Sequence, residues 1–435
     1  MKQLSTIDIK RNFFINFGLC LYYSILVYIL LSWNSIGETP PITYRLLFLF
    51  AFALPLFKYK NLFPVLLVSF SFIQSNMIAT MGYFPNKPIF ILSLCIILLL
   101  TQKRQDKQIK IRYIISSSLL LKFIILTLII NLFNVNTNLN GTITLIFILT
   151  FSSFLTNYSS VKFFLSLFPL ACIISSCYFL ANMSTVLIET SSGAERAFFN
   201  DPNMTALNIG FGLIVSLMYI TKRFTLFQNK FATILHSINI ILSIIAIAII
   251  ASRGAFIAIF ISFLFIISKI KSSNKTIIFF ACILIITFLY QIGLFNTIID
   301  RLNEDDVTSG NGRLDIWRVG FKRFFNLDIL KILFGGGDYF SLEVCKKAIS
   351  GYSGLLSPHN QFIWYIFDYG LIGGSFFILY LAKLYKTSIS SKNKIYLLLI
   401  YSSIGFMTLP PISSSIIYPC FLSFIIALHN KKLTI

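Results

Sequence analysis

Apolar runs of about 20 residues recur along most of this chain, and they limit its fold more than any other feature. A helix needs about 20 apolar residues to cross a bilayer, because backbone polar groups inside lipid must be hydrogen-bonded within their own segment. Charged residues make up 12% of the sequence, against about 25% in a soluble domain. We therefore predict an all-α polytopic membrane protein, in which residues 1–435 form a single integral membrane domain.

The hydropathy pattern predicts about 14 transmembrane helices. The apolar run 231–268 is too long for one helix, so we expect a helical hairpin with its turn at Ser252-Arg253-Gly254. The predicted helices cover residues 13–32, 42–57, 62–80, 89–101, 113–133, 141–157, 162–182, 203–221, 231–250, 254–268, 276–296, 359–382, 395–409 and 413–428.

Lys and Arg are concentrated in alternate junctions between these helices. With the N-terminus inside, one side of the membrane carries 23 Lys/Arg and two acidic residues, and the other side carries 12 Lys/Arg and 12 acidic residues. Because positive loops stay in the cytoplasm, we expect both termini to be cytoplasmic and residues 183–202, Arg253 and 297–357 to face the periplasm of a bacterial inner membrane. The net charge of +21 then reflects membrane orientation, and no nucleic-acid partner is expected.

Residues 297–357 form the long polar stretch of the chain, which we predict to be a large periplasmic loop with short amphipathic helices. Residues 313–325 have the pattern of a helix lying on the membrane, with Arg318 and Lys322 away from its apolar face. That predicted face consists of Leu314, Trp317, Phe321 and Phe324. The loop has one cysteine, Cys345, and no Cys/His spacing suggests a metal site.

Three arginines fall on the predicted periplasmic face: Arg196, Arg253 and Arg313. A guanidinium group is permanently charged, and its paired donors match the oxygens of a phosphate. Such a group in a short apolar turn, as at Arg253, is costly unless it is paired, which favours a functional role there. For the other two arginines, anchoring to lipid headgroups remains an equal alternative. Asp201 and Pro202 have the pattern of a cap and a first helical residue.

His359 is the candidate general base on this face. Its ordinary pKa near 6.5 suits proton transfer at neutral pH, and we expect it at the N-terminus of a helix, where backbone N–H groups bind anions. Asp368 lies nine residues later, about 13 Å deeper in a straight helix. We expect a structural ion pair there, with Lys122 as a candidate partner. Gly335-Gly336-Gly337 fits a flexible turn and lacks the Lys-Ser/Thr of a P-loop.

Five short motifs, in this order on one membrane face, resemble the O-antigen polymerase and O-antigen ligase superfamily of envelope glycosyltransferases. The resemblance covers about 190–380, whereas the first half of the chain offers only hydropathy. The motifs are Arg196 with Asp201-Pro202-Asn203, Ser252-Arg253-Gly254, Gly312-Arg313-Leu314-Asp315-Ile316-Trp317, Phe334-Gly335-Gly336-Gly337, and His359-Asn360 followed by Asp368-Tyr369-Gly370-Leu371-Ile372-Gly373.

This resemblance implies a metal-independent and cofactor-independent transferase that takes glycan from undecaprenyl pyrophosphate. It implies that Arg253 and Arg196 hold the donor pyrophosphate with help from Arg313, and that His359 deprotonates the acceptor hydroxyl. Residues expected to contact substrate also include Asp201, Asn203, Arg318 and Asn360.

Within the superfamily we expect a polymerase, which extends a lipid-linked repeat unit, with a chain-length regulator protein as a candidate partner. A ligase, which transfers finished glycan to lipid A-core, is the close alternative. A secondary transporter is the alternative of another class, because transporters also carry charges within the membrane. No internal repeat supports that alternative, and the basic residues gather on one face.

Overall fold

Helices form nearly all of the part of the chain that the structure, a computed structural model, describes. This part comprises 118–134, 139–154, 158–181, 187–189, 195–197, 202–221, 230–268, 313–346, 356–389 and 396–407, with isolated residues within 18–54, 287–293 and 422–426. The exception is an antiparallel ribbon of β1 (Leu187–Glu189) and β2 (Glu195–Ala197). The predicted segments 62–80 and 89–101 lie outside the described residues, so the number of membrane-spanning helices stays a prediction.

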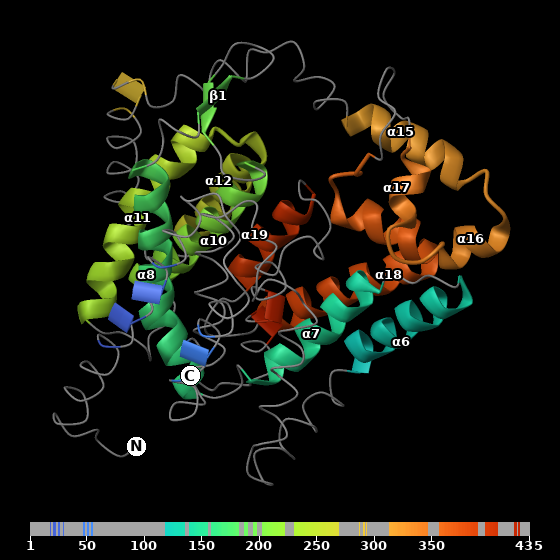
Figure 1. The fold of residues 1–435 in the computed structure, drawn as a ribbon, viewed down its shortest axis with the longest axis horizontal. Coiled ribbons are helices and arrows are strands. Elements are labelled where there is room, and N and C mark those ends of the chain that lie inside the picture. Colours follow the sequence, from blue (N-terminus) through green and yellow to red (C-terminus); the bar gives the residue numbers. More distant parts are fainter. Residues whose placement is uncertain are drawn as a thin grey trace, which may run out of the picture.

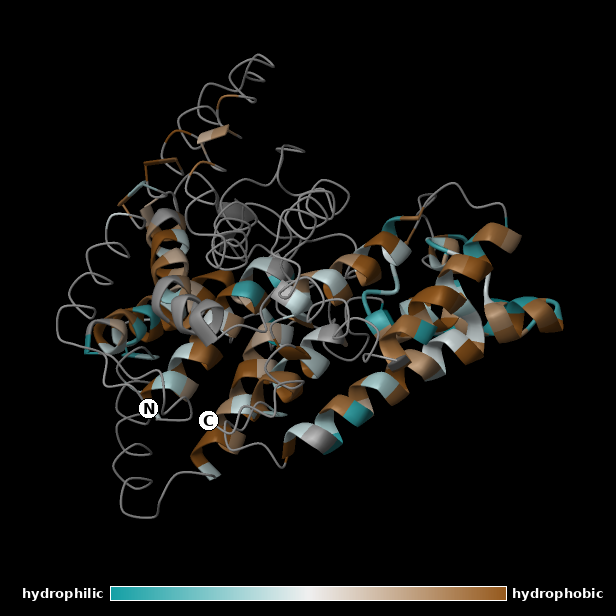
Figure 2. Ribbon diagram, turned by 90° about the horizontal axis from the view of Figure 1, so that it is seen from below, coloured by the Kyte–Doolittle hydropathy of each residue, from teal (hydrophilic) through white to brown (hydrophobic). Residues whose placement is uncertain are grey.

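The long helices coincide with predicted segments to within a few residues. They are α6 (Ser118–Phe133), α7 (Asn140–Phe154), α8 (Tyr158–Ala181), α10 (Pro202–Ile220), α11 (Lys230–Ile250), α12 (Arg253–Ser268), α18 (Gln361–Ile389) and α19 (Tyr396–Phe406). Three short helices occupy the polar stretch, namely α15 (Arg313–Phe324), α16 (Ile329–Phe334) and α17 (Phe340–Val344). Figure 2 shows that apolar residues dominate the long helices.

Figure 1 shows the helices in two neighbouring groups. In the first group α10 packs against α8, α11, α12 and α19. In the second group α6 and α7 pack together, α6 also lies along α18, and α15 to α17 cover the beginning of α18. Helix α19 contacts α10, α12 and α18, and so it links the two groups.

The predicted break between α11 and α12 is confirmed. Ala251 has a positive φ of 54°, which reverses the chain. The Ser252 hydroxyl then accepts the N–H of Ala255, in the manner of a helix cap. Beyond this turn the helices separate, since α11 packs against α8 and α10, whereas α12 packs against α10 and α19.

Helix α18 bends sharply at Gly370, where φ is 68° and ψ is −176°. The rings of Tyr365 and Phe377 have centroids 4.6 Å apart, although residues twelve apart in a straight helix are separated by about 18 Å. An added Cβ at Gly374 would lie 2.6 Å from Ile366 across the bend. The helix therefore consists of two arms, residues 361–369 and 371–389.

Among the described residues, two helical stretches are long and apolar enough to cross a membrane: Ala232–Ile250 and Gln361–Lys386. The bend shows that the second stretch is not one straight span. Its second arm, 371–389, would be about 28 Å long, close to the thickness of a bilayer core. The predicted helix over 359–382 is therefore present as α18, but it is bent, because the hydropathy of the run does not register the turn at Gly370.

The first arm of α18 separates two hydrophobic cores. Trp364, Tyr365 and Tyr369 belong to the main core, whereas Ile363 and Phe367 belong to a smaller core beneath α15 to α17. The loop helices therefore share a core with this arm.

Candidate functional site

The residues around His359 fix its backbone. His359 has a positive φ of 46°, a left-handed conformation that only about a few per cent of non-glycine residues adopt, histidine more often than most. Its N–H lies 3.2 Å from the Ser357 hydroxyl. The side chain of Asn360 accepts the N–H groups of Phe362 and Ile363 and so caps α18. His359 therefore precedes the helix cap, which corrects the prediction that it occupies the helix N-terminus itself.

Helix α15 holds the segment before His359 through one tryptophan. The indole N–H of Trp317 donates to the carbonyl oxygen of Pro358 over 2.7 Å. The structure therefore joins the motif that begins at Gly312 to the motif that begins at His359. Arg313 is the first residue of α15, and Arg318 is exposed on it, with a 3.5 Å ion pair to Asp315.

The face of α15 that we predicted to lie on the membrane packs against protein. Phe324 is fully buried, and Trp317 and Phe321 are partly buried against the smaller core. Only Leu314 of that predicted face is exposed. Arg323 donates to the carbonyl oxygens of Val344 and Lys346, so this arginine holds α15 to the end of α17.

A second pair of motifs meets at the turn between α11 and α12. The hydroxyl of Ser252 donates to the side-chain oxygen of Asn203 over 2.8 Å, and Arg253 begins α12 beside this bond. Pro202 is the first residue of α10, as predicted, whereas Asp201 lies outside the described residues. Arg196 lies in β2 opposite Ile188, and this strand contacts α11.

The glycines after α16 meet the bend of α18. An added Cβ at Gly335 would lie 2.1 Å from the carbonyl oxygen of Asp368, and one at Gly370 would lie 2.2 Å from that of Leu333. The N–H of Gly337 donates to the same Asp368 carbonyl over 2.8 Å. Gly335 and Gly337 therefore form a close backbone contact with α18, and the prediction of a flexible turn was wrong.

Asp338, which follows these glycines, binds the beginning of α7 and the end of α6. Its carboxylate accepts the N–H of Gly141 over 2.6 Å, the N–H of Thr142 over 3.3 Å and the amide of Asn131 over 3.0 Å. The hydroxyl of Tyr369 also donates to it. The N–H of Asp338 donates back to the side-chain oxygen of Asn131 over 2.8 Å. A carboxylate at the first turn of α7 is also favoured by the helix dipole.

Asp368 binds the loop and not Lys122. Its carboxylate accepts the N–H groups of Tyr339 over 3.0 Å and Ser341 over 2.7 Å. Lys122 is exposed on α6, so the predicted ion pair was wrong. His359 and Asp368 both lie before the bend at Gly370, whereas the arm that could span the membrane begins after it. The predicted distance of about 13 Å between them therefore does not give the depth of Asp368 in a membrane. Among the described residues, the partners of this buried carboxylate are backbone N–H donors, which are sufficient to satisfy it.

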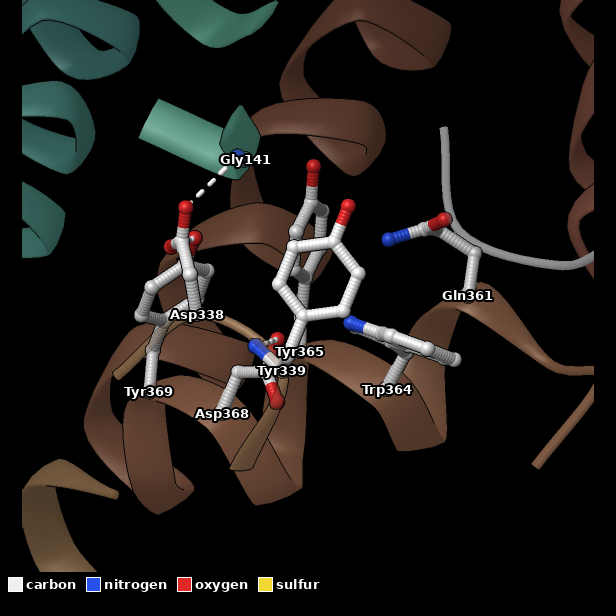
Figure 3. Close-up of a pocket in the computed structure, with 8 residues that line it drawn as sticks. All are labelled: Gly141, Asp338, Tyr339, Gln361, Trp364, Tyr365, Asp368 and Tyr369. Carbon is white, nitrogen blue, oxygen red and sulfur yellow. Dashed lines mark hydrogen bonds between the residues drawn. The ribbon is translucent and has the colours of Figure 1, made fainter. Parts of the chain in front are cut away.

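Asp338 and Asp368 line one small recess together with aromatic side chains (Figure 3). Its other lining residues are Gly141, Tyr339, Gln361, Trp364, Tyr365 and Tyr369. Both carboxylates are at least 96% buried, and the recess has room for about one water molecule. The recess is too small for a sugar ring. Its carboxylates instead form buried hydrogen bonds that hold the loop to the helices.

The sequence interpretation missed Asp338 and its partners. The available signal was the acidic residue directly after Gly335-Gly336-Gly337. Its partner Asn131 lies 207 residues earlier, so sequence spacing could not reveal the contact.

Cys345 is an unpaired, buried thiol in the smaller core. Burial raises the pKa of this thiol to about 12, although the nearby Arg323 guanidinium lowers it. A thiol in this state is a packing residue and not a nucleophile.

A helical loop lies over the ends of α6, α7 and α18. The apolar helices, two of which in the described part are long enough to cross a membrane, are those expected of a helical membrane protein. Residues 238–378 match the sequence model of a protein family described as O-antigen ligase. This range extends from α11 into α18 and contains Arg253, Arg313 and His359. The match confirms the predicted resemblance to the O-antigen polymerase and ligase superfamily. No curated protein matched the chain.

Proposed function

We propose that this protein is a glycosyltransferase at the periplasmic face of the bacterial inner membrane, with an undecaprenyl-pyrophosphate-linked glycan as donor. The match of residues 238–378 to the O-antigen ligase family supports glycosyl transfer in general. We choose His359 as the base because of its backbone conformation. His359 is left-handed, and it is held between the hydrogen bond from Trp317 to Pro358 and the helix cap at Asn360. Strained conformations of this kind are concentrated at functional sites.

In the proposed step, the acceptor sugar gives its hydroxyl proton to the imidazole of His359. The hydroxyl oxygen forms a bond to the anomeric carbon of the donor, while the bond from that carbon to the pyrophosphate oxygen breaks. The pyrophosphate leaves on its lipid carrier with an increased negative charge. A base near its working pH suits the first transfer, and stabilising the leaving group is expected to be the largest contribution.

Arg253 is our leading candidate to stabilise the pyrophosphate, with Arg196 and Arg313 as further candidates. Arg253 begins α12 beside the Ser252–Asn203 hydrogen bond, so the turn that presents it is connected to α10. Arginine offers paired donors to phosphate oxygens. We assign no metal or cofactor to this reaction.

We favour a polymerase, which would transfer the growing chain onto a new lipid-linked repeat unit. The description of the matched family as O-antigen ligase supports the second candidate, transfer to lipid A-core. The two reactions share the donor and the base, and they differ in the acceptor.

The proposal can be tested with His359→Asn and His359→Gln in a strain that lacks the wild-type gene. Asparagine adopts the left-handed backbone of His359 readily, and neither amide accepts a proton at neutral pH. Both variants should therefore fold, reach the membrane and fail to transfer glycan. Lys346→Ala, which removes an exposed charge of the same loop, is the matched control and should remain active.

The products identify the reaction. A polymerase that loses its base should leave lipopolysaccharide capped with a single repeat unit, whereas a ligase should leave bare core and long chains on the lipid carrier. An unchanged ladder of chain lengths in both variants would reject His359 as the base. Substrate flux into vesicles without glycan extension would instead indicate the transporter.

A further inference from the structure

An unexpected apolar surface lies on α16 and the turn before it. Phe325, Ile329 and Leu330 are 55%, 65% and 66% exposed, and Phe334 is 38% exposed. Helix α16 lies at the edge of the molecule, outside α18, in Figure 1. So many large apolar side chains within ten residues of a polar loop mark an interaction surface. We call these four residues the α16 patch.

The patch is connected to a row of apolar side chains on the second arm of α18. Leu371, Ile378 and Leu379 are exposed on this arm at helical spacing. Helix α16 packs directly against α18, and Gly370 touches the backbone of Leu333. If the second arm spans a membrane, this row would face lipid chains, and the α16 patch would lie near the Gly370 end of that arm.

The charges near the patch are suited to lipid headgroups. Lys331 is exposed on α16, and its ion pair with Asp328 is half-exposed and 3.8 Å long. Amphipathic helices with large apolar residues on one face and basic residues on the other bind at the boundary between headgroups and acyl chains. The mixture of large apolar and basic side chains is typical of this interface and less so of a protein core.

We propose that the α16 patch inserts into the bilayer leaflet on the side of the loop, at the level of the headgroups and upper acyl chains. The occupant is the phospholipid of the surrounding membrane. This contact would fix the height of α16, and thereby of the Gly335–Asp338 segment that follows it, relative to the membrane surface. It depends on the protein being a membrane protein and not on the proposed transfer reaction.

The proposal can be tested with single tryptophans in purified full-length protein reconstituted into phosphatidylcholine–phosphatidylglycerol vesicles. Leu330→Trp reports on the patch, and its exposure means that the substitution disturbs no packing. Leu379→Trp on the second arm of α18 is the control within lipid, and Arg318→Trp on exposed α15 is the control outside it. The wild-type protein supplies the signal of the native tryptophans, which is subtracted.

We expect lipids brominated near the top of the acyl chain to quench Leu330→Trp strongly and Arg318→Trp weakly. Lipids brominated deep in the chain should quench Leu379→Trp more than Leu330→Trp. Quenching of Leu330→Trp no greater than that of Arg318→Trp, with Leu379→Trp still quenched, would overturn the proposal. Protection of Leu330→Trp that appears only in a dimeric protein would also overturn it, because a second copy would then be the occupant.

Discussion

The side chains of Asp338 and Asp368 stabilise the loop through hydrogen bonds to N–H groups. A buried carboxylate is costly unless its oxygens are well hydrogen-bonded. Asp338 accepts donors from α6 and α7, and Asp368 accepts donors from the residues that begin α17. Asp338 therefore connects the loop to α6 and α7, and Asp368 connects it to the first arm of α18.

We expect Asp338→Ala to destabilise the protein strongly. The substitution leaves the N–H groups of Gly141 and Thr142 and the hydroxyl of Tyr369 without this acceptor. Each buried group that is left unsatisfied costs about 1–3 kcal/mol, so the total should be about 3 kcal/mol or more. Asp328→Ala is the matched control, because it removes a 58% exposed capping carboxylate of α16 and should cost about 1 kcal/mol. Thermal unfolding in detergent measures both changes, and equal shifts in Tm would contradict the role of Asp338.

A substitution of Arg253 separates pyrophosphate binding from membrane anchoring. We expect Arg253→Ala to abolish glycan transfer and Arg253→Lys to restore it in part, because a point charge cannot reproduce a paired contact with phosphate. Lys230→Ala removes a positive charge at the far end of α11 and should leave transfer unchanged. The measurement is glycan extension by normally expressed protein, and near-normal extension by Arg253→Ala would assign this residue to anchoring.

At the scale of elements, the contact between α16 and α18 requires glycine on both sides. Gly370 has φ of 68°, a conformation that other residues rarely adopt, and it touches the backbone of Leu333. Gly335 has φ of 75° and touches the backbone of Asp368. Neither backbone can move aside as a flexible side chain could, so the two glycines set how closely the elements approach.

We therefore expect Gly370→Ala and Gly335→Ala to reduce the yield of folded protein sharply. The unfavourable φ alone costs about 1–3 kcal/mol, and the overlap with backbone atoms adds to it. Gly18→Ala is the control, because an added Cβ there meets no atom within 4 Å. Size-exclusion chromatography of detergent extracts should show aggregation of the first two variants only. A monodisperse Gly370→Ala protein would show that α18 can straighten without loss of the fold.

Hydropathy was sufficient to predict most described helices, because a helix in lipid satisfies its own backbone and needs only a continuous apolar run. It could not predict the bend of α18, since the run from Phe362 to Leu381 stays largely apolar through Gly370. A glycine inside such a run is compatible with a straight helix as well. The bend depends on Gly335, which lies 35 positions earlier in the chain, and on a backbone contact that no local pattern encodes.

The candidate site was only partly predictable for the same reason. Short motifs indicated His359 and Arg253, because base and guanidinium chemistry depends on residue type. Their neighbours Trp317 and Asn203 belong to other motifs, and only the fold shows that Trp317 bonds to Pro358 and Asn203 to Ser252. Lys122 was predicted to pair with Asp368 because the two residues have similar predicted depths. In the structure, backbone N–H groups are the partners of the Asp368 carboxylate.

At the scale of the whole molecule, contacts in the fold agree with the charge pattern of the sequence. Asn131 at the end of α6 bonds to Asp338 in the loop, and Asn203 at the start of α10 bonds to Ser252. The charge asymmetry independently places each of these pairs on one face of the membrane. Segments that touch at their helix ends must lie on the same side, so two unrelated lines of argument give the same relative orientation.

Topology is the remaining prediction, since the proposed chemistry requires the loop to meet a donor at the periplasmic face. Alkaline phosphatase fused after Lys347 should be active, because it folds only after export, and green fluorescent protein fused there should be dark. The reverse pattern is expected for fusions after Ile435. Fusions in the junction between α6 and α7 should behave like those after Lys347, since Asn131 and Gly141 contact Asp338. A cytoplasmic signal after Lys347 would separate His359 and Arg253 from the proposed donor and would reject the site. Opposite signals after Lys347 and in the junction between α6 and α7 would contradict the contacts of Asp338 and thereby the fold.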